Sequence, residues 1–255
     1  MDIFVNLPYL LPVIFFIFAL AYSSVGLGGG SSYTAMMLIV GMSTLTIPLL
    51  SLILNLVVTT IGSFNFIRHR HAKLSLLIPF IVTSIPMAYL GGALKLPRDL
   101  FYLILFISLL FTIFQLYFWK TTSLNLSLTK NKKIIISLIA GSLFGFIAGT
   151  VGIGGGIYLV PLIIILGLGS QKEAAACGVV FIWLNSASGL ISRLQYNAID
   201  LAQYTPLIIA VLLGGALGSH LGASHLAPRT MEKILGIIVI AAVIVLAKKL
   251  FYLYF

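Results

Sequence analysis

Two glycine-rich motifs carry the residues of this chain best suited to hold a small anion. Val25–Gly30 (VGLGGG) returns later as Val151–Gly156 (VGIGGG). Each motif stands between two apolar runs, where a membrane helix would otherwise continue, and such a break persists only beside a polar cavity or within protein. Free backbone N–H groups and the positive end of a following helix attract an anion. We therefore take as candidate substrate-binding residues Gly28, Gly29, Gly30, Ser31, Gly154, Gly155 and Gly156.

Polar side chains after each motif are candidates for the walls of the same site. Asn55 and Thr59 lie one helical turn apart, as do Asn185 and Ser188, and the two Asn residues occupy corresponding places after the motifs. Interhelical hydrogen bonds, worth about 0.6 kcal/mol each, are the alternative explanation for such residues. No acidic residue stands in the middle of a predicted span, which favours an anion over a bare cation.

Titratable side chains offer one further candidate, for proton coupling. His220 lies within a predicted span and His225 near its end, and histidine titrates near neutral pH. An interfacial position or a packing hydrogen bond is the alternative for both. We find no nucleophile paired with a base, no metal-ligand cluster and no cofactor loop, so we predict no enzymatic activity, no metal and no cofactor. The glycine motifs lack the strand–helix–strand context of a dinucleotide site.

Composition places these residues in a membrane. The chain has 255 residues, of which only 8% are charged, against about 25% in soluble proteins. We predict an all-α polytopic protein of the lipid bilayer, in a prokaryotic inner membrane. The short apolar runs 31–40 and 157–168 are too short to cross it and are predicted to be re-entrant half-helices. The predicted spans are 8–25, 47–67, 74–94, 100–119, 134–150, 174–191, 201–223 and 234–253.

The repeated motif divides the chain into two homologous four-helix halves, each with a glycine-broken re-entrant element. They are residues 1–119 and 134–255, joined by a basic polar linker, 120–133. Basic residues mark cytoplasmic loops, so the net charge of +10 is a topology signal and we expect no nucleic-acid partner. With eight spans, the cluster 68–73, the linker and Lys248–Lys249 fall on one side, and both termini are cytoplasmic. Were each glycine element to cross fully, the halves would be inverted.

The two motifs and the short run containing Pro161 resemble the TauE/SafE (TSUP) family of sulfite and organosulfonate exporters. The resemblance covers essentially the whole chain. It implies a secondary transporter of anions such as sulfite, sulfonates or sulfoacetate, with proton coupling. The chain departs from symmetry because Ala35 replaces Pro161 and Ser31–Ser32 replace Ile157–Tyr158, so the two half-sites are expected to differ chemically.

Our hypothesis from the sequence is an alternating-access exporter whose site lies between the two glycine breaks and is walled by Asn55 and Asn185. A passive anion channel is the alternative. The expected partners are a small anionic substrate and the lipid bilayer, and a homo-oligomer is left open.

Overall fold

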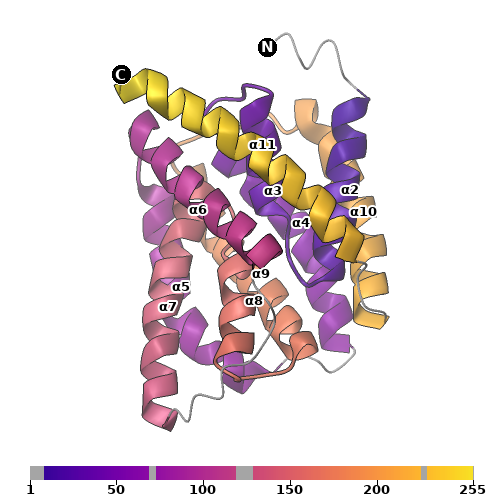
Figure 1. Ribbon diagram of the computed structural model, residues 1–255, viewed down its shortest axis with the longest axis vertical. Coiled ribbons are helices and arrows are strands. Elements are labelled where there is room, and N and C mark those ends of the chain that lie inside the picture. Colours follow the sequence, from indigo (N-terminus) through magenta and orange to yellow (C-terminus); the bar gives the residue numbers. More distant parts are fainter. Residues whose placement is uncertain (1–8, 69–72, 119–128, 225–228, 255) are drawn as a thin grey trace.

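The computed structural model of the chain describes residues 9–68, 73–118, 129–224 and 229–254. The described residues form α-helices and one short 3-10 helix and contain no strand (Figure 1). The predicted all-α class is confirmed. The helices are α2 Leu10–Ser24, α3 Gly30–Ile39, α4 Thr46–Arg68, α5 Leu74–Ala93, α6 Arg98–Phe118, α7 Lys130–Val151, α8 Gly156–Ile165, α9 Gln171–Leu194, η1 Ala202–Tyr204, α10 Thr205–Ser224 and α11 Arg229–Tyr254.

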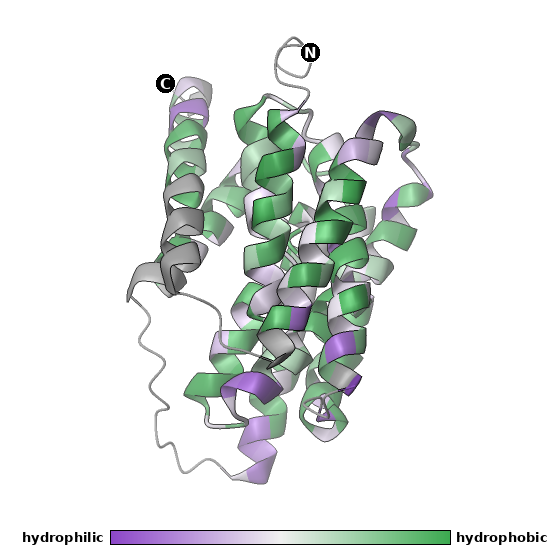
Figure 2. Ribbon diagram, turned by 90° about the vertical axis from the view of Figure 1, so that its right-hand side faces the viewer, coloured by the Kyte–Doolittle hydropathy of each residue, from purple (hydrophilic) through white to green (hydrophobic). Residues whose placement is uncertain are grey.

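Long apolar helices make up most of the molecule. In the part of the chain that the structure describes, α4, α5, α7, α9 and α10 are each long and apolar enough to cross a membrane. Their outer faces expose large apolar side chains such as Val82 and Ile139. Figure 2 shows hydrophobic residues along the length of the helices, with strongly hydrophilic residues gathered toward the ends of the molecule. These faces suit contact with lipid, and the chain is an integral membrane protein.

Both glycine motifs interrupt a helix. α2 ends at Ser24 and α3 begins at Gly30, and α7 ends at Val151 and α8 begins at Gly156. Glycine adopts left-handed backbone without steric cost, which explains why these positions stop the helices. Each following helix has ten residues, or about 15 Å. Left-handed backbone occurs at Gly26 (φ 77°), Gly29 (89°), Gly152 (84°), Gly154 (82°) and Gly155 (78°).

The first break turns the chain back toward the end from which α2 came. α2 packs parallel to α10, and Ser23 Oγ donates to the carbonyl of Gly215, in the middle of α10, at 3.0 Å. Gly28, just after the end of α2, lies against Asn55 in the middle of α4, so the break lies part of the way along α4. α3 then leads to the start of α4. The helices α4 and α9 are antiparallel, so the start of α4 lies beside the end of α9, where a Cβ at Gly189 would contact Leu52. α2 and α3 form a hairpin, and the crossing of the membrane by residues 8–25 stays a prediction.

The second break is built in the same way on the other half of the chain. α7 packs parallel to α5 through a stripe of small residues, Gly141, Gly145 and Gly149, where any Cβ would overlap a backbone carbonyl of α5. Thr83 Oγ1 also donates to Leu138 O at 2.7 Å across this contact. Each broken helix thus packs on a helix of the opposite half.

Basic residues are divided between the two ends of the bundle, which we call the Lys73 end and the Tyr102 end. Lys73 pairs with Glu173 at 2.6 Å, where α5 and α9 begin. Lys249, near the end of α11, lies 5.6 Å from the Tyr102 ring and 3.5 Å from Leu38 O. The prediction that all three basic clusters lie on one side is wrong for Lys249, because α8 brings the chain back to the Lys73 end, where Gly169 lies beside Leu76.

This arrangement also bears on the predicted termini. α2 begins at the Tyr102 end and α11 finishes there (Figure 1), opposite the end where Arg68 and Lys73 lie. Residues 1–8 and 255 lie outside the described residues, and the predicted cytoplasmic termini stay a prediction. Residues 69–72 of the basic cluster 68–73, His225 and most of the linker 120–133 also lie outside the described residues.

Candidate functional site

The two glycine breaks meet at Asn55, in the middle of α4. The Nδ2 atom of Asn55 donates to Gly152 O of the second motif at 3.1 Å. Asn55 is fully buried, and a Cβ at Gly28 of the first motif would lie 2.6 Å from its Oδ1 atom. A Cβ at Gly30 would lie 2.6 Å from Ile153 O. The backbones of the two motifs are therefore in direct contact beside this one side chain.

Glycine is required at this junction for space as well as for backbone conformation. Gly28 and Gly30 do not have left-handed backbone, yet a side chain on either would overlap Asn55. At Gly154 a Cβ would approach Asn55 Nδ2 at 3.0 Å and Ser186 Oγ at 3.4 Å. Polar atoms from α4 and α9 thus surround the contact between the motifs.

Several polar groups at the junction lack a hydrogen-bond partner. Within the described residues, the amide N–H groups of Gly28 to Ser32 and of Gly154 to Ile157 make no hydrogen bond. Asn55 Oδ1 and Ser186 Oγ are buried without one. Buried polar groups are normally paired, and helix N-termini with free N–H groups bind anions. The free N–H groups, with the Ser186 hydroxyl as a further donor, can therefore hold a small oxyanion, whereas Asn55 Oδ1 can only accept a hydrogen bond.

Asn185 does not mirror Asn55, although the two residues occupy corresponding places in the sequence. Its Nδ2 atom donates to Phe181 O of its own helix at 2.8 Å, and its Oδ1 atom is buried without a partner. Instead Ile182 and Ser186 of α9 reach the glycines. The junction is asymmetric, as the unequal half-motifs led us to expect.

The remaining candidates lie at various distances from the glycines. Ser31, on the first turn of α3, donates to Tyr22 Oη at 3.1 Å. Thr59 donates to Asn55 O within α4 at 2.6 Å. Ser188 donates to Ile85 O of α5 at 2.7 Å, which is an interhelical packing bond. His220 lies on the exposed face of α10.

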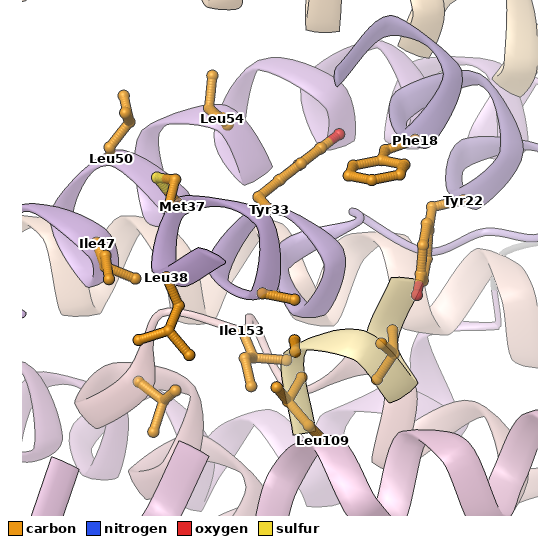
Figure 3. Close-up of a cluster of buried hydrophobic side chains, with 14 of the residues drawn as sticks. Phe18, Tyr22, Tyr33, Met37, Leu38, Ile47, Leu50, Leu54, Leu109 and Ile153 are labelled. Atoms are coloured by element: carbon orange, nitrogen blue, oxygen red, sulfur yellow. The ribbon is translucent and has the colours of Figure 1, made fainter. Parts of the chain in front are cut away.

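Aromatic packing fixes α3 against the first break. The rings of Phe15 and Tyr33 stack with centroids 5.3 Å apart, and a Cβ at Gly29 would overlap the Tyr33 ring at 2.7 Å. Figure 3 shows Tyr33 directed toward Phe18 of α2, with Ile153 of the second motif on the other side of α3. Residues 26–35 and 151–159 are buried throughout. The junction is therefore closed to solvent in this conformation.

Sequence reasoning missed two polar residues near the breaks. Ser51, one turn before Asn55, donates to the same Gly152 O at 2.7 Å. Arg193 is buried and donates to Gly149 O and Thr150 O at the end of α7. A charge inside a membrane helix marks a functional position. That signal was lost because the predicted span ended at residue 191, whereas α9 continues to Leu194.

Comparisons with known proteins agree with this architecture. Residues 10–246 match the family described as sulfite exporter TauE/SafE. The chain is 32% identical over 236 residues to the probable membrane transporter protein y4hK of Sinorhizobium fredii, covering 91% of this chain and 95% of that protein. It is 30% identical over 96 residues to the probable membrane transporter protein YunE of Bacillus subtilis, covering 38% and 35%. No solved structure matches. The match over nearly the whole chain shows that this protein belongs to the TauE/SafE sulfite exporter family.

Proposed function

We propose that the protein is a secondary transporter that exports small sulfur-containing oxyanions, such as sulfite or organosulfonates including sulfoacetate. The observation that carries this proposal is the meeting of two glycine breaks at Asn55, where unpaired amides stand beside unpartnered side-chain oxygens. The family membership and the relatives' names as membrane transporters support the class of function. The donors of Gly28–Gly30 and Gly154–Gly156 bind the negative charge, and Asn55 orients the oxygens.

The mechanism that we propose is alternating access between two inverted halves, residues 1–119 and 134–255. Support comes from the packing, in which α2 lies on α10 while α7 lies on α5, so the two hairpins enter the bundle from opposite ends. The closed junction corresponds to an occluded conformation. Movement of one hairpin relative to α4 and α9 would open the junction to one side and then to the other.

The orientation that we propose follows from the basic residues. The Lys73 end carries Arg68, Lys73 and the start of α7 with Lys130, Lys132 and Lys133. By the positive-inside rule this end is cytoplasmic. The start of α2 and the end of α11 then lie on the extracytoplasmic side, toward which an exporter releases its substrate.

Transport by purified protein in proteoliposomes tests the function. We expect uptake of radiolabelled sulfite to be accelerated by unlabelled sulfite on the other side of the membrane, because a carrier exchanges substrate through one site. A channel only dissipates the substrate's own gradient and shows no such counterflow. Absence of counterflow, with rapid downhill flux, would replace the transporter by the channel. An imposed pH gradient, applied to the wild type and to His220→Gln, tests proton coupling in the same vesicles.

A further inference from the structure

Arg193 carries a buried positive charge that the glycine junction does not use. The residue is 6% exposed. Its Nε and Nη2 atoms donate to Gly149 O at 3.2 and 2.9 Å, and Nη2 donates to Thr150 O at 2.6 Å. Carbonyls in the last turn of a helix lack intrahelical partners and carry its negative end. Arg193 therefore caps α7 immediately before the second glycine break.

This cap leaves part of the guanidinium without a partner. Arginine has five N–H donors, and the two on Nη1 make no hydrogen bond to the described residues. Across those same ranges, no carboxylate lies within ion-pair distance of Arg193. A buried charge is costly unless it is paired. The free side of Arg193 is therefore suited to an anion that the protein does not itself supply.

A cavity adjoins Arg193 at the Tyr102 end of the bundle. Its volume is about 190 Å³, and its polar lining residues are Thr44, Lys95, Thr150, Arg193, Tyr196 and Asn197. The lining contains two cations and no carboxylate. Since water occupies about 30 Å³ per molecule in the liquid, the cavity has room for a small oxyanion with part of its hydration shell. Thr150 connects it to the end of α7, beside the second break.

We propose that this cavity is a second anion-binding site, a vestibule in which Arg193 Nη1 and Lys95 bind an oxyanion on its way to or from the glycine junction. Charge-assisted hydrogen bonds from a guanidinium are among the strongest that proteins make to oxyanions. The inference extends the proposed function and rests on it. A lipid phosphate offers the same chemistry as a free oxyanion, so the experiment separates the two sources.

A single reporter thiol tests the vestibule. Cys177 is the only cysteine and is buried, so Thr44→Cys with Cys177→Ser places one accessible thiol in the cavity lining. We measure its modification rate in the detergent-purified full chain with anionic and cationic methanethiosulfonates. Focusing by nearby cations raises the encounter rate of an anion by about 10-fold or more, so the anionic reagent should react faster. Inorganic sulfate should slow the anionic reagent more than chloride at equal ionic strength.

Charge variants assign the effect to Arg193. Arg193→Gln should lower the anionic-to-cationic rate ratio by about 10-fold and abolish sulfate protection, whereas Arg193→Lys should retain both. Arg98→Gln is the matched control, because Arg98 lies at the same end but bonds to Tyr102 outside the cavity lining. Equal effects of Arg98→Gln and Arg193→Gln would overturn the proposal. If Arg193→Gln does not fold, lack of sulfate protection in the parent protein overturns it.

Two further comparisons separate a lipid headgroup from a free anion, and the vestibule from the proposed function. In nanodiscs, slowing of the anionic reagent by anionic lipid, without any effect of sulfate, would assign the cavity to a lipid headgroup and overturn the vestibule. None of these measurements requires transport. Sulfate protection that depends on Arg193 in a protein without counterflow would therefore refute the proposed function and support the vestibule.

Discussion

Asn55 and Asn185 form a matched pair for testing the junction. Both are fully buried asparagines, and the Nδ2 atom of each donates to one backbone carbonyl. Only Asn55 joins the two motifs, because its acceptor is Gly152 O whereas that of Asn185 belongs to its own helix. Replacing each by alanine removes the same atoms. The comparison thus isolates the contribution of position.

The structure sets the magnitude. Asn55→Ala removes a hydrogen bond worth about 0.5–1.5 kcal/mol. Gly152 O is not orphaned, because Ser51 still donates to it at 2.7 Å. The bond from Asn55 to Gly152 O contributes to folding, as does the bond lost in Asn185→Ala. Loss of the orienting side chain facing an anionic substrate removes about 1.5–3 kcal/mol of substrate stabilisation. Since 1.4 kcal/mol is a factor of ten, kcat/KM for sulfite should fall about 10- to 150-fold. Asn185→Ala should lower it by less than about 5-fold.

Initial rates of sulfite counterflow in proteoliposomes, corrected for the amount of reconstituted protein, measure the difference. Thermal unfolding in detergent verifies that both variants are folded. If Asn185→Ala reduced kcat/KM as much as Asn55→Ala at equal stability, the assignment of the site to the contact between the motifs would be wrong.

Three further predictions concern the same contacts. Ser51→Ala combined with Asn55→Ala should destabilise the protein by about 1 kcal/mol or more beyond the sum of the two single variants. The reason is that only the double variant removes both donors to Gly152 O. If the fall in unfolding temperature of the double variant equalled the sum of the two single falls, this prediction would be contradicted. Gly145→Ala should cost at least about 1–3 kcal/mol, since its Cβ overlaps the backbone of Ser84. By contrast, Gly41→Ala has open space, and left-handed backbone (φ 81°) should make it cost about 1 kcal/mol. The reverse order in thermal unfolding would refute the packing argument. Lys73→Met should change stability by less than about 1 kcal/mol, because the Lys73 side chain is 58% exposed in its pair with Glu173; a larger loss of the unfolding temperature would show that this ion pair is needed for assembly.

The sequence predicted the local elements better than their directions. Helix α3 was expected over 31–40 and runs over Gly30–Ile39, because glycines that cannot continue a helix fix its start. The orientation of α2 could not be read in the same way. Its apolar run is compatible with a crossing or with a hairpin, and its place in the bundle depends on its packing against Gly215, far along the chain.

The candidate site shows the same division. Periodicity placed Asn55 and Asn185 on equivalent faces, but it cannot say which carbonyl an amide finds in three dimensions. Asn55 meets the other motif, and Asn185 meets Phe181. Arg193 was missed for a different reason. The apolar run that predicted the span ends at residue 191, whereas α9 continues to Leu194. The functional interest of Arg193 comes from burial, which a sequence without coordinates does not contain.

The pairing of α2 with α10 has a consequence for biosynthesis. Ser23 and Gly215 are 192 residues apart, and ribosomes extend a chain at about 5–20 residues per second. The first hairpin therefore waits about 10–40 seconds after its own synthesis before the surface that receives it exists. During that interval its glycines and its short helix must be sheltered by lipid or by the insertion machinery. The hairpin that is synthesised first is therefore among the last parts of the protein to be packed in place.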